Sequence, residues 1–203
     1  MQITTGIRSI LSIPLIYSFF QYLMGSKKGW KMVVNEYIRP HHNCLILDIG
    51  CGPADILNYL PEVDYWGFDI SDVYISKAKE KYGNRGQFFS KILTCKDLDN
   101  MPTFDLVIAS GLLHHVDDEG AKSIFTIAHN ALKPNGRMIT IDPCFIPKQN
   151  LIARFLISKD RGQNVRNQLG YETLANEAFS HVNVHIKHKA WIPYTHCIME
   201  CTK

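Results

Sequence analysis

The stretch LILDIGCGPADIL, residues 45–57, decides the fold of this chain. An apolar run that starts at Leu45 reaches Asp48, and the chain then turns through Gly50 and Gly52 into a segment of helical character. Glycine has no Cβ, so the backbone can approach a ligand closely at such a turn, and a helix that follows directly presents free N–H groups there. The stretch therefore predicts a ligand-binding turn at the end of a buried strand.

The residues that follow extend this pattern into an α/β sheet. Short apolar runs alternate with longer amphipathic segments between Cys44 and Asp142, which is typical of parallel strands joined by helices. The expected strands are Leu45–Ile49, Tyr65–Asp69, Gln87–Ser90, Leu106–Ser110 and Arg137–Asp142. The expected helices are Pro53–Leu60, Asp72–Tyr82 and Glu119–Leu132, the last one ended by a turn at residues 134–136.

Beyond Asp142 the pattern changes. We expect helices over Asn150–Ser158 and Tyr171–Phe179, with a polar loop between them. Apolar residues alternate with polar ones over residues 182–186, and a second strand-like run covers Tyr194–Cys201. The chain is therefore predicted to close with an antiparallel pair of strands at one end of the sheet.

Composition narrows the class of protein. Hydrophobic residues make up 46% of the chain and charged residues 20%, which describes an ordinary globular protein rather than a disordered one. The net charge is only +3 and the basic residues are scattered, so binding to nucleic acid is neither required nor excluded. The six cysteines form no C-x-x-C pair, and we expect a reducing, cytoplasmic compartment.

The N-terminal stretch Ile7–Met24 is apolar but is interrupted by Arg8 and Pro14. The run is too broken to span a bilayer, and no A-x-A cleavage site follows it. We expect an amphipathic helix that acts as a lid, with Tyr17 and Gln21 on one of its faces. The alternative is a helix on a membrane surface, because Lys27 and Lys28 lie shortly after the stretch.

The glycine turn distinguishes between kinds of ligand. A dinucleotide-binding turn would carry a small residue where Asp55 stands, and a carboxylate fits poorly beside a pyrophosphate. An amino-acid headgroup fits better, because Asp48 attracts an ammonium while the turn amides receive a carboxylate. Asp69 ends the next expected strand, 21 residues after Asp48, where a carboxylate can accept hydrogen bonds from both hydroxyls of a ribose. A charge that merely stabilises the following helix is the alternative for Asp69.

Four blocks in this order resemble the class I S-adenosylmethionine-dependent methyltransferases: the turn from Asp48 to Gly52, then Asp69, FDLVIASGLLHHV (residues 104–116) and ALKPNGRMITID (residues 131–142). The resemblance implies a Rossmann-like α/β fold, with a seven-stranded, mostly parallel sheet, helices on both faces and an antiparallel last strand. It implies S-adenosylmethionine as the cofactor. We expect one domain over residues 1–203, made of a helical lid (1–43), a cofactor-binding core (44–142), and a substrate-side insertion with the terminal strand pair (143–203).

The resemblance also implies a set of cofactor contacts. These are Asp48, Gly50, Gly52, Asp69, Ile70, Ile92 and Ser110 at the strand ends, with Tyr17 and Gln21 of the lid over the methionine end. Two positions depart from the family pattern: Ala54 stands where many members have a third glycine, and FFSKIL (residues 88–93) lacks the acidic residue that reads the adenine amino group. Ile92 would then cover an adenine face, and Lys91 would point elsewhere.

Two histidines follow the fourth expected strand. His114 and His115 lie where ligands bind in open α/β sheets, and Asp142 ends the adjacent strand. A carboxylate can orient a histidine and stabilise its charged form, an arrangement common in general-base catalysis. The spacing predicts that one of the two rings pairs with Asp142 and acts as the base, and leaves open which one. Packing of either ring against the next helix is the structural alternative.

The loop KDRGQNVR, residues 159–166, and the last strand supply candidate acceptor contacts. Arg161 fits a carboxylate or phosphate of the acceptor, although a solvated loop is the commoner outcome for such a sequence. Tyr194 and His196 either line the pocket or pack in the core.

These features predict methyl transfer from S-adenosylmethionine to an oxygen or nitrogen of a small-molecule acceptor, with no metal, no nucleic-acid partner and no integral membrane segment. A methyltransferase acting on nucleic acid or protein is the nearest alternative, and it is disfavoured because the chain has no clustered basic face and no N-P-P-Y motif. A non-catalytic protein that binds S-adenosylmethionine is another. A third alternative function, that of a nicotinamide-dependent oxidoreductase, is supported by the glycine turn alone.

Overall fold

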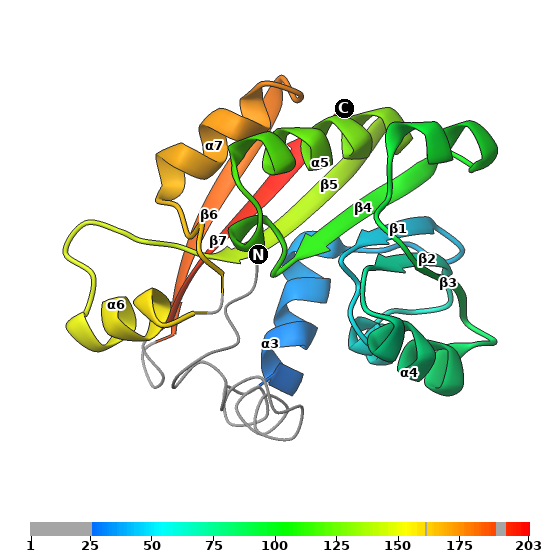
Figure 1. Ribbon diagram of the computed structural model, residues 1–203, viewed down its shortest axis with the longest axis horizontal. Coiled ribbons are helices and arrows are strands. Elements are labelled where there is room, and N and C mark those ends of the chain that lie inside the picture. The colour runs from blue at the N-terminus through cyan, green and yellow to red at the C-terminus, as the bar shows by residue number, and fades with distance from the viewer. Residues whose placement is uncertain (1–25, 161, 190–193) are drawn as a thin grey trace.

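A seven-stranded sheet forms the centre of the computed structural model, which describes residues 26–160, 162–189 and 194–203 (Figure 1). Its strands are β1 (Leu45–Ile49), β2 (Asp64–Asp69), β3 (Gly86–Ser90), β4 (Phe104–Ser110), β5 (Leu132–Pro143), β6 (His181–Lys189) and β7 (Tyr194–Thr202). The strand order is β3-β2-β1-β4-β5-β7-β6. Neighbours from β3 to β5 run parallel, and β7 is antiparallel to both β5 and β6. The predicted mostly parallel sheet with an antiparallel closing pair is confirmed.

Helices cover both faces of this sheet. They are α3 (Ser26–Val33), which continues into the π-helical turn η1 (Val34–Ile38), α4 (Asp72–Tyr82), α5 (Asp118–Ala131), α6 (Leu151–Ser158) and α7 (Gln168–Asn176). Short 3-10 turns are η2 (Asp55–Asn58), η3 (Cys95–Asn100) and η4 (Leu113–His115).

Alternation along the strands divides the buried residues into two cores. Successive side chains of a strand point to opposite faces, so Leu47 joins one core and Ile46 the other. The first core lies between the sheet and helices α5 and α7, where Phe125 is fully buried. The second lies under α3, η1 and α4, where Ile75 is buried.

The predicted helix Pro53–Leu60 is wrong in extent, and the predicted helix Tyr171–Phe179 instead spans Gln168–Asn176. The segment Pro53–Leu60 forms only the single turn η2. Gly52 and Ala54 both adopt left-handed backbone angles, with φ of 54° and 56°, and an α-helix cannot continue through them. The expected turn at residues 134–136 is likewise part of the long strand β5, where Asn135 has a φ of 63°.

The described part of the predicted lid belongs to the core. Val34 and Ile38 are buried against the sheet, and Arg137 of β5 donates hydrogen bonds to the carbonyls of Tyr37 (2.9 Å) and Ile38 (2.7 Å). The packed core therefore begins before residue 44. Tyr17 and Gln21 lie outside the described residues.

Membrane-spanning helices and disulfide bonds can both be looked for among the described residues. No helix among them is long and apolar enough to cross a membrane. All six cysteines lie in described segments, and each is a free thiol. The cytoplasmic location stays a prediction.

Candidate active site

The turn after β1 is held open by its glycines. Gly50 has a φ of 76° and donates to the carbonyl of Phe68 at 2.7 Å, which ties the turn to β2. A Cβ on Gly50 would meet Leu112 at 3.0 Å, whereas a Cβ on Gly52 would meet nothing within 4 Å among the described residues. None of the described residues therefore crowds the backbone at Gly52, as a turn that approaches a ligand requires.

Asp69 is fixed at the end of β2 by two backbone donors. Its Oδ2 accepts from the N–H of Gly52 at 2.9 Å, and its Oδ1 accepts from the N–H of Ser71 at 2.8 Å. A carboxylate offers about four lone-pair sites, so two remain for a ligand. Asp69 is therefore oriented by the turn and still able to accept two hydroxyl groups, as predicted for a ribose.

Asp48 lies beneath the turn rather than on its surface. It is buried, and the hydroxyl of Tyr65 donates to its Oδ2 at 2.6 Å. Burial raises the pKa of Asp48 to about 7, with the Tyr65 hydrogen bond lowering it and the charge of Asp69 raising it. The expected contact of Asp48 with a ligand ammonium stays a prediction.

Two exposed isoleucines follow the neighbouring strand ends. Ile70 is 73% exposed after β2, and Ile92 is 71% exposed after β3. The Nζ of Lys91, which directly precedes Ile92 in the sequence, pairs with Asp97 Oδ1 at 2.7 Å. Large apolar side chains left in water beside a hydrogen-bonding carboxylate are suited to an apolar ring. The turn, Asp69 and these side chains together fit a nucleoside with an amino-acid headgroup.

Of the two histidines, His114 is the one that pairs with Asp142. Its Nδ1 lies 2.7 Å from Asp142 Oδ1, and its backbone N–H donates to the same oxygen at 3.2 Å. Its Nε2 lies 3.2 Å from Asp160 Oδ1, so both ring nitrogens face carboxylates. The side chain is buried.

These contacts decide the charge of His114. Burial acts to lower its pKa, but the hydrogen bonds with Asp142 and Asp160 outweigh burial and raise the pKa to about 9. The pKa of Asp160 is lowered by the same pairing, against the effect of its own burial. At neutral pH the ring is an imidazolium that donates both of its N–H groups, and it has no free lone pair with which to accept a proton.

Asp160 joins the last strand to this cluster. Its Oδ2 accepts from the hydroxyl of Tyr194 at 2.7 Å, and its Oδ1 accepts from the N–H of Gly162 at 2.9 Å. Tyr194 also contacts His196, with ring centroids 5.0 Å apart. The structure thus brings three of the predicted site residues, His114, Asp142 and Tyr194, together through Asp160, a carboxylate of the polar loop that was not predicted as a site residue.

The polar loop is built around the histidine turn η4. A Cβ on Gly162 would lie 2.0 Å from His114 Cδ2, and the N–H of Asn164 donates to the His114 carbonyl at 3.0 Å. Arg166 donates to the carbonyls of Leu113 and Val116 and pairs with Asp118. Arg166 is therefore a structural residue rather than part of a solvated loop. Arg161 lies outside the described residues.

His115 is the more exposed of the two rings. Its ring centroid lies 4.0 Å from that of His114, with the planes tilted by 39°. It is half-buried, as is Ser110 at the end of β4. Because β2, β1 and β4 run parallel, the carboxyl ends of β2 and β4 share one edge of the sheet, and His115, which follows β4, lies at the same edge as Asp69.

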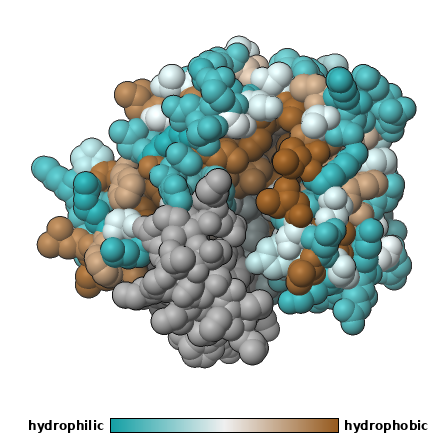
Figure 2. Space-filling view, viewed as in Figure 1, coloured by the Kyte–Doolittle hydropathy of each residue, from teal (hydrophilic) through white to brown (hydrophobic). Residues whose placement is uncertain are grey.

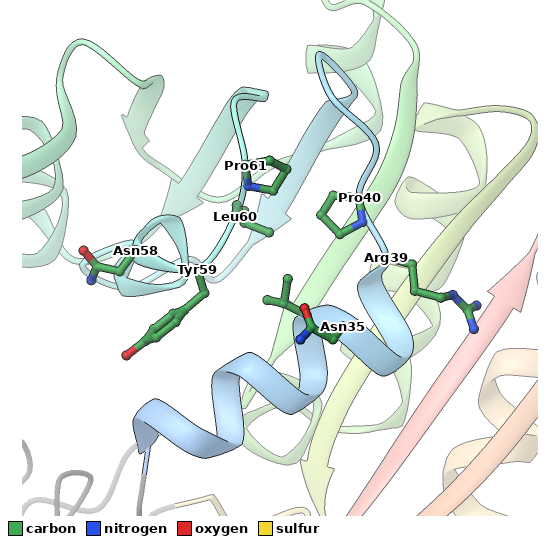
Figure 3. Close-up of a pocket in the computed structure, with 8 residues that line it drawn as sticks. Asn35, Arg39, Pro40, Asn58, Tyr59, Leu60 and Pro61 are labelled. Atoms are coloured by element: carbon green, nitrogen blue, oxygen red, sulfur yellow. The ribbon is translucent and has the colours of Figure 1, made fainter.

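A separate hollow lies at the opposite edge of the sheet (Figure 3). It has a volume of about 600 Å³ and is lined by residues that include Asn35, Pro40, Tyr59 and Pro61. Pro40 precedes β1 and Pro61 precedes β2, so this hollow borders the amino ends of the strands. Ligands of open α/β sheets bind at the carboxyl ends, and the histidines and Asp69 are all there.

Comparisons with known proteins agree with this geometry. Residues 47–138 match a family model described as a methyltransferase domain. The chain is 31% identical over 100 residues to the biotin biosynthesis bifunctional protein BioHC of Saccharophagus degradans, which covers 46% of this chain and 17% of that protein. It is 29% identical over 140 residues to phosphoethanolamine N-methyltransferase 3 of Arabidopsis thaliana, with coverage of 66% and 28%. The chain thus spans less than a third of either relative.

Solved structures share the fold at low sequence identity. The pyocyanin biosynthetic protein PhzM superposes with a TM-score of 0.71 at 13% identity, over 98% of this chain and 62% of that one. The mitomycin 7-O-methyltransferase MmcR gives 0.66 at 17% identity, over 94% and 58%. The matched methyltransferase domain, the order of the motifs and the order of the strands agree with the class I methyltransferases that use S-adenosylmethionine.

Proposed function

We propose that this chain transfers the methyl group of S-adenosylmethionine to an oxygen or nitrogen of a small-molecule acceptor. The observation that carries the proposal is Asp69, held by the amides of Gly52 and Ser71 beside the exposed side chains of Ile70 and Ile92. A small-molecule acceptor is supported by the relatives named above as phosphoethanolamine and mitomycin methyltransferases.

On the cofactor side, the residues of this chain bind and orient S-adenosylmethionine. Asp69 accepts the ribose hydroxyls, and Ile70 and Ile92 cover the adenine. The amides after β1 receive the carboxylate of the amino-acid end, and Ser110 lies at the neighbouring strand end. Tyr17 and Gln21 cover the methionine end.

On the acceptor side, alignment does most of the work. S-adenosylmethionine supplies a methyl group activated by its sulfonium, and transfer requires the acceptor atom in line behind the methyl carbon. We assign the base to His115, because both ring nitrogens of His114 already donate to Asp142 and Asp160. His114 is a positioning residue that fixes the loop and the turn on which His115 lies. Arg161, Tyr194 and His196 border the acceptor.

The charges of the cluster favour this reaction. His114 carries one positive charge, while Asp142 and Asp160 carry two negative charges, so one net negative charge lies beside His115. A fixed negative charge stabilises positive charge that develops at an acceptor as it takes up a methyl group.

The test is a labelled-methyl screen. The purified protein is incubated with S-adenosylmethionine that carries an isotopic methyl label and with fractionated metabolites, and products are detected by the mass of one added methyl group. We expect a labelled metabolite whose formation resists added salt. Labelling of nucleic acid or protein instead, or tight cofactor binding without any transfer, would support one of the alternative functions.

A further inference from the structure

Helix α6 presents an apolar face to solvent. Leu151 is 82% exposed, Ile152 61% and Phe155 60%, whereas Ala153 and Ile157 on the opposite side of the helix are buried. The helix lies at the margin of the molecule, and Figure 2 shows hydrophobic side chains gathered at that margin. Apolar side chains that are clustered and this exposed are uncommon on a surface with no partner.

Basic residues flank this face. Lys148, Arg154 and Lys159 are all exposed, and none of them makes an ion pair with a described residue. At about 100° per residue, Arg154 lies on the side of Leu151 that faces away from Phe155, and Lys159 is the residue that caps the end of the helix. The Lys159 Nζ lies 5.7 Å from the centre of the Phe155 ring. Residues 145–159 contain no Asp or Glu, so the whole segment is basic.

We propose that α6 binds an anionic membrane surface, with Leu151, Ile152 and Phe155 among the acyl chains and Lys148, Arg154 and Lys159 at the lipid phosphates. Apolar side chains rimmed by lysine and arginine are the arrangement of helices that lie in a lipid interface. This inference does not depend on the proposed reaction.

Charge favours an anionic membrane over two other possible partners for the exposed face of α6. The chain's own N-terminal segment is apolar, but residues 1–35 contain no Asp or Glu, so it offers no carboxylate to the three basic side chains. A second copy related by a two-fold axis would place the same basic face against itself, which repulsion opposes. Lipid phosphates supply the missing negative charge.

The position of α6 links this surface to the active site. Lys159 follows the helix directly, and the next residue, Asp160, contacts His114. A membrane under α6 would therefore lie close to the acceptor side of the sheet edge. Three apolar side chains on a helix of eight residues anchor weakly, so binding is expected to be reversible and sensitive to salt.

The experiment is co-sedimentation of the full chain with vesicles of phosphatidylcholine, with and without phosphatidylglycerol. One variant carries Leu151→Ser, Ile152→Ser and Phe155→Ser, and a second carries Lys148→Gln, Arg154→Gln and Lys159→Gln. The control is Leu169→Ser, which removes an apolar side chain that is 69% exposed on α7. Circular dichroism melting establishes that each variant is folded.

We expect binding that requires phosphatidylglycerol and falls as salt is added. Each triple variant should weaken it by about tenfold or more, while the control leaves it unchanged. Absence of binding by the unaltered protein overturns the proposal. So does binding that the serine variant retains, because the attachment would then lie elsewhere in the chain, and so does a dimer that the serine variant dissociates without any vesicle binding.

Discussion

Burial and charge act against each other on His114, and the balance sets what this side chain can do. A buried imidazole is expected to lose its proton, because a low dielectric disfavours the charged form. Two carboxylates in contact with the ring reverse that expectation and hold its pKa at about 9. His114, which the sequence predicts as a candidate base, is therefore a positively charged side chain held between Asp142 and Asp160.

The first prediction at this scale concerns stability against pH. The pKa of His114 is about 9 in the folded chain and about 6.5 when unfolded. Its stabilising contribution is therefore complete below about pH 6.5 and is lost as pH rises through 9, by at most about 3 kcal/mol. Denaturant unfolding of the unaltered protein and of His114→Gln should show a difference in unfolding free energy that shrinks over this window.

Asp48 affects the unfolding free energy in a lower pH range, and its effect must be distinguished from that of His114. Its raised pKa of about 7 removes stability as pH rises from about 4 to 7, and this effect is present in both proteins and cancels in the difference. Nitrogen-15 NMR of the imidazole measures the His114 pKa directly. A measured pKa near 6.5 for this ring would contradict a charged His114 held between Asp142 and Asp160.

A second prediction concerns cofactor recognition by Asp69. Replacing Asp69 with Ala removes the acceptor for two ribose hydroxyls, which should weaken S-adenosylmethionine binding by about 1–3 kcal/mol and reduce the thermal shift that the cofactor produces. Asp72→Ala is the matched control, since Asp72 is an exposed carboxylate in the first turn of α4. NAD should stabilise neither protein. An equal response of both variants to the cofactor would reject the ribose contact.

A third prediction concerns the base. His115→Ala should lower turnover by about 10²–10⁴-fold with little change in cofactor affinity, and the rate of the unaltered enzyme should fall toward acid pH as the ring becomes protonated. Asp142→Asn should also lower turnover, but less, because Asp142 acts through His114. Labelled-methyl transfer to the identified acceptor measures both. Normal turnover in His115→Ala would mean that alignment alone drives the reaction.

At the scale of elements, the loop 159–164 and the turn η4 form one unit. The loop passes so close to His114 that Gly162 has no room for a side chain. Gly162→Ala should therefore push the loop off the ring and lower the unfolding free energy by about 1–3 kcal/mol, while cofactor affinity stays unchanged because Asp69 lies on β2. Calorimetric melting and titration measure the two effects.

The control for this variant is Gly170→Ala. Gly170 lies in α7, where a Cβ would come no closer than 3.2 Å to its neighbours and where alanine is the better helix former. The control should keep or raise stability. If Gly162→Ala melts like the control, the loop does not depend on contact with His114.

The elements also mark what a sequence can and cannot predict. The strand from Leu45 to Ile49 was predicted at its observed bounds, because a buried parallel strand reads as an unbroken apolar run between turn signals. The extent of η2 was not predicted, because nothing in the sequence identifies Ala54 as a residue with left-handed backbone angles. Asp160 was missed for a different reason: it lies 46 residues beyond His114, and no periodicity reports a contact made by a loop that folds back.

At the scale of the whole molecule, the N-terminal region divides at the start of the described core. Residues 33–38 pack under the sheet, and the carbonyls of Tyr37 and Ile38 accept hydrogen bonds from Arg137. The lid expected from the sequence can therefore include only residues that precede this packed segment.

Two truncations test that division. Removal of residues 1–24 should leave cooperative unfolding intact and weaken S-adenosylmethionine binding, because the predicted cofactor contacts Tyr17 and Gln21 are lost while the packed segment remains. Removal of residues 1–38 should instead lower the unfolding free energy by several kcal/mol, since it strips buried apolar side chains such as Val34 from the sheet and leaves the Arg137 guanidinium without its carbonyl partners. Circular dichroism melting and calorimetric titration with the cofactor distinguish the two effects. If the shorter truncation also abolishes cooperative unfolding, residues 1–24 are core and not a lid; if it leaves cofactor affinity unchanged, the methionine end is covered by other residues.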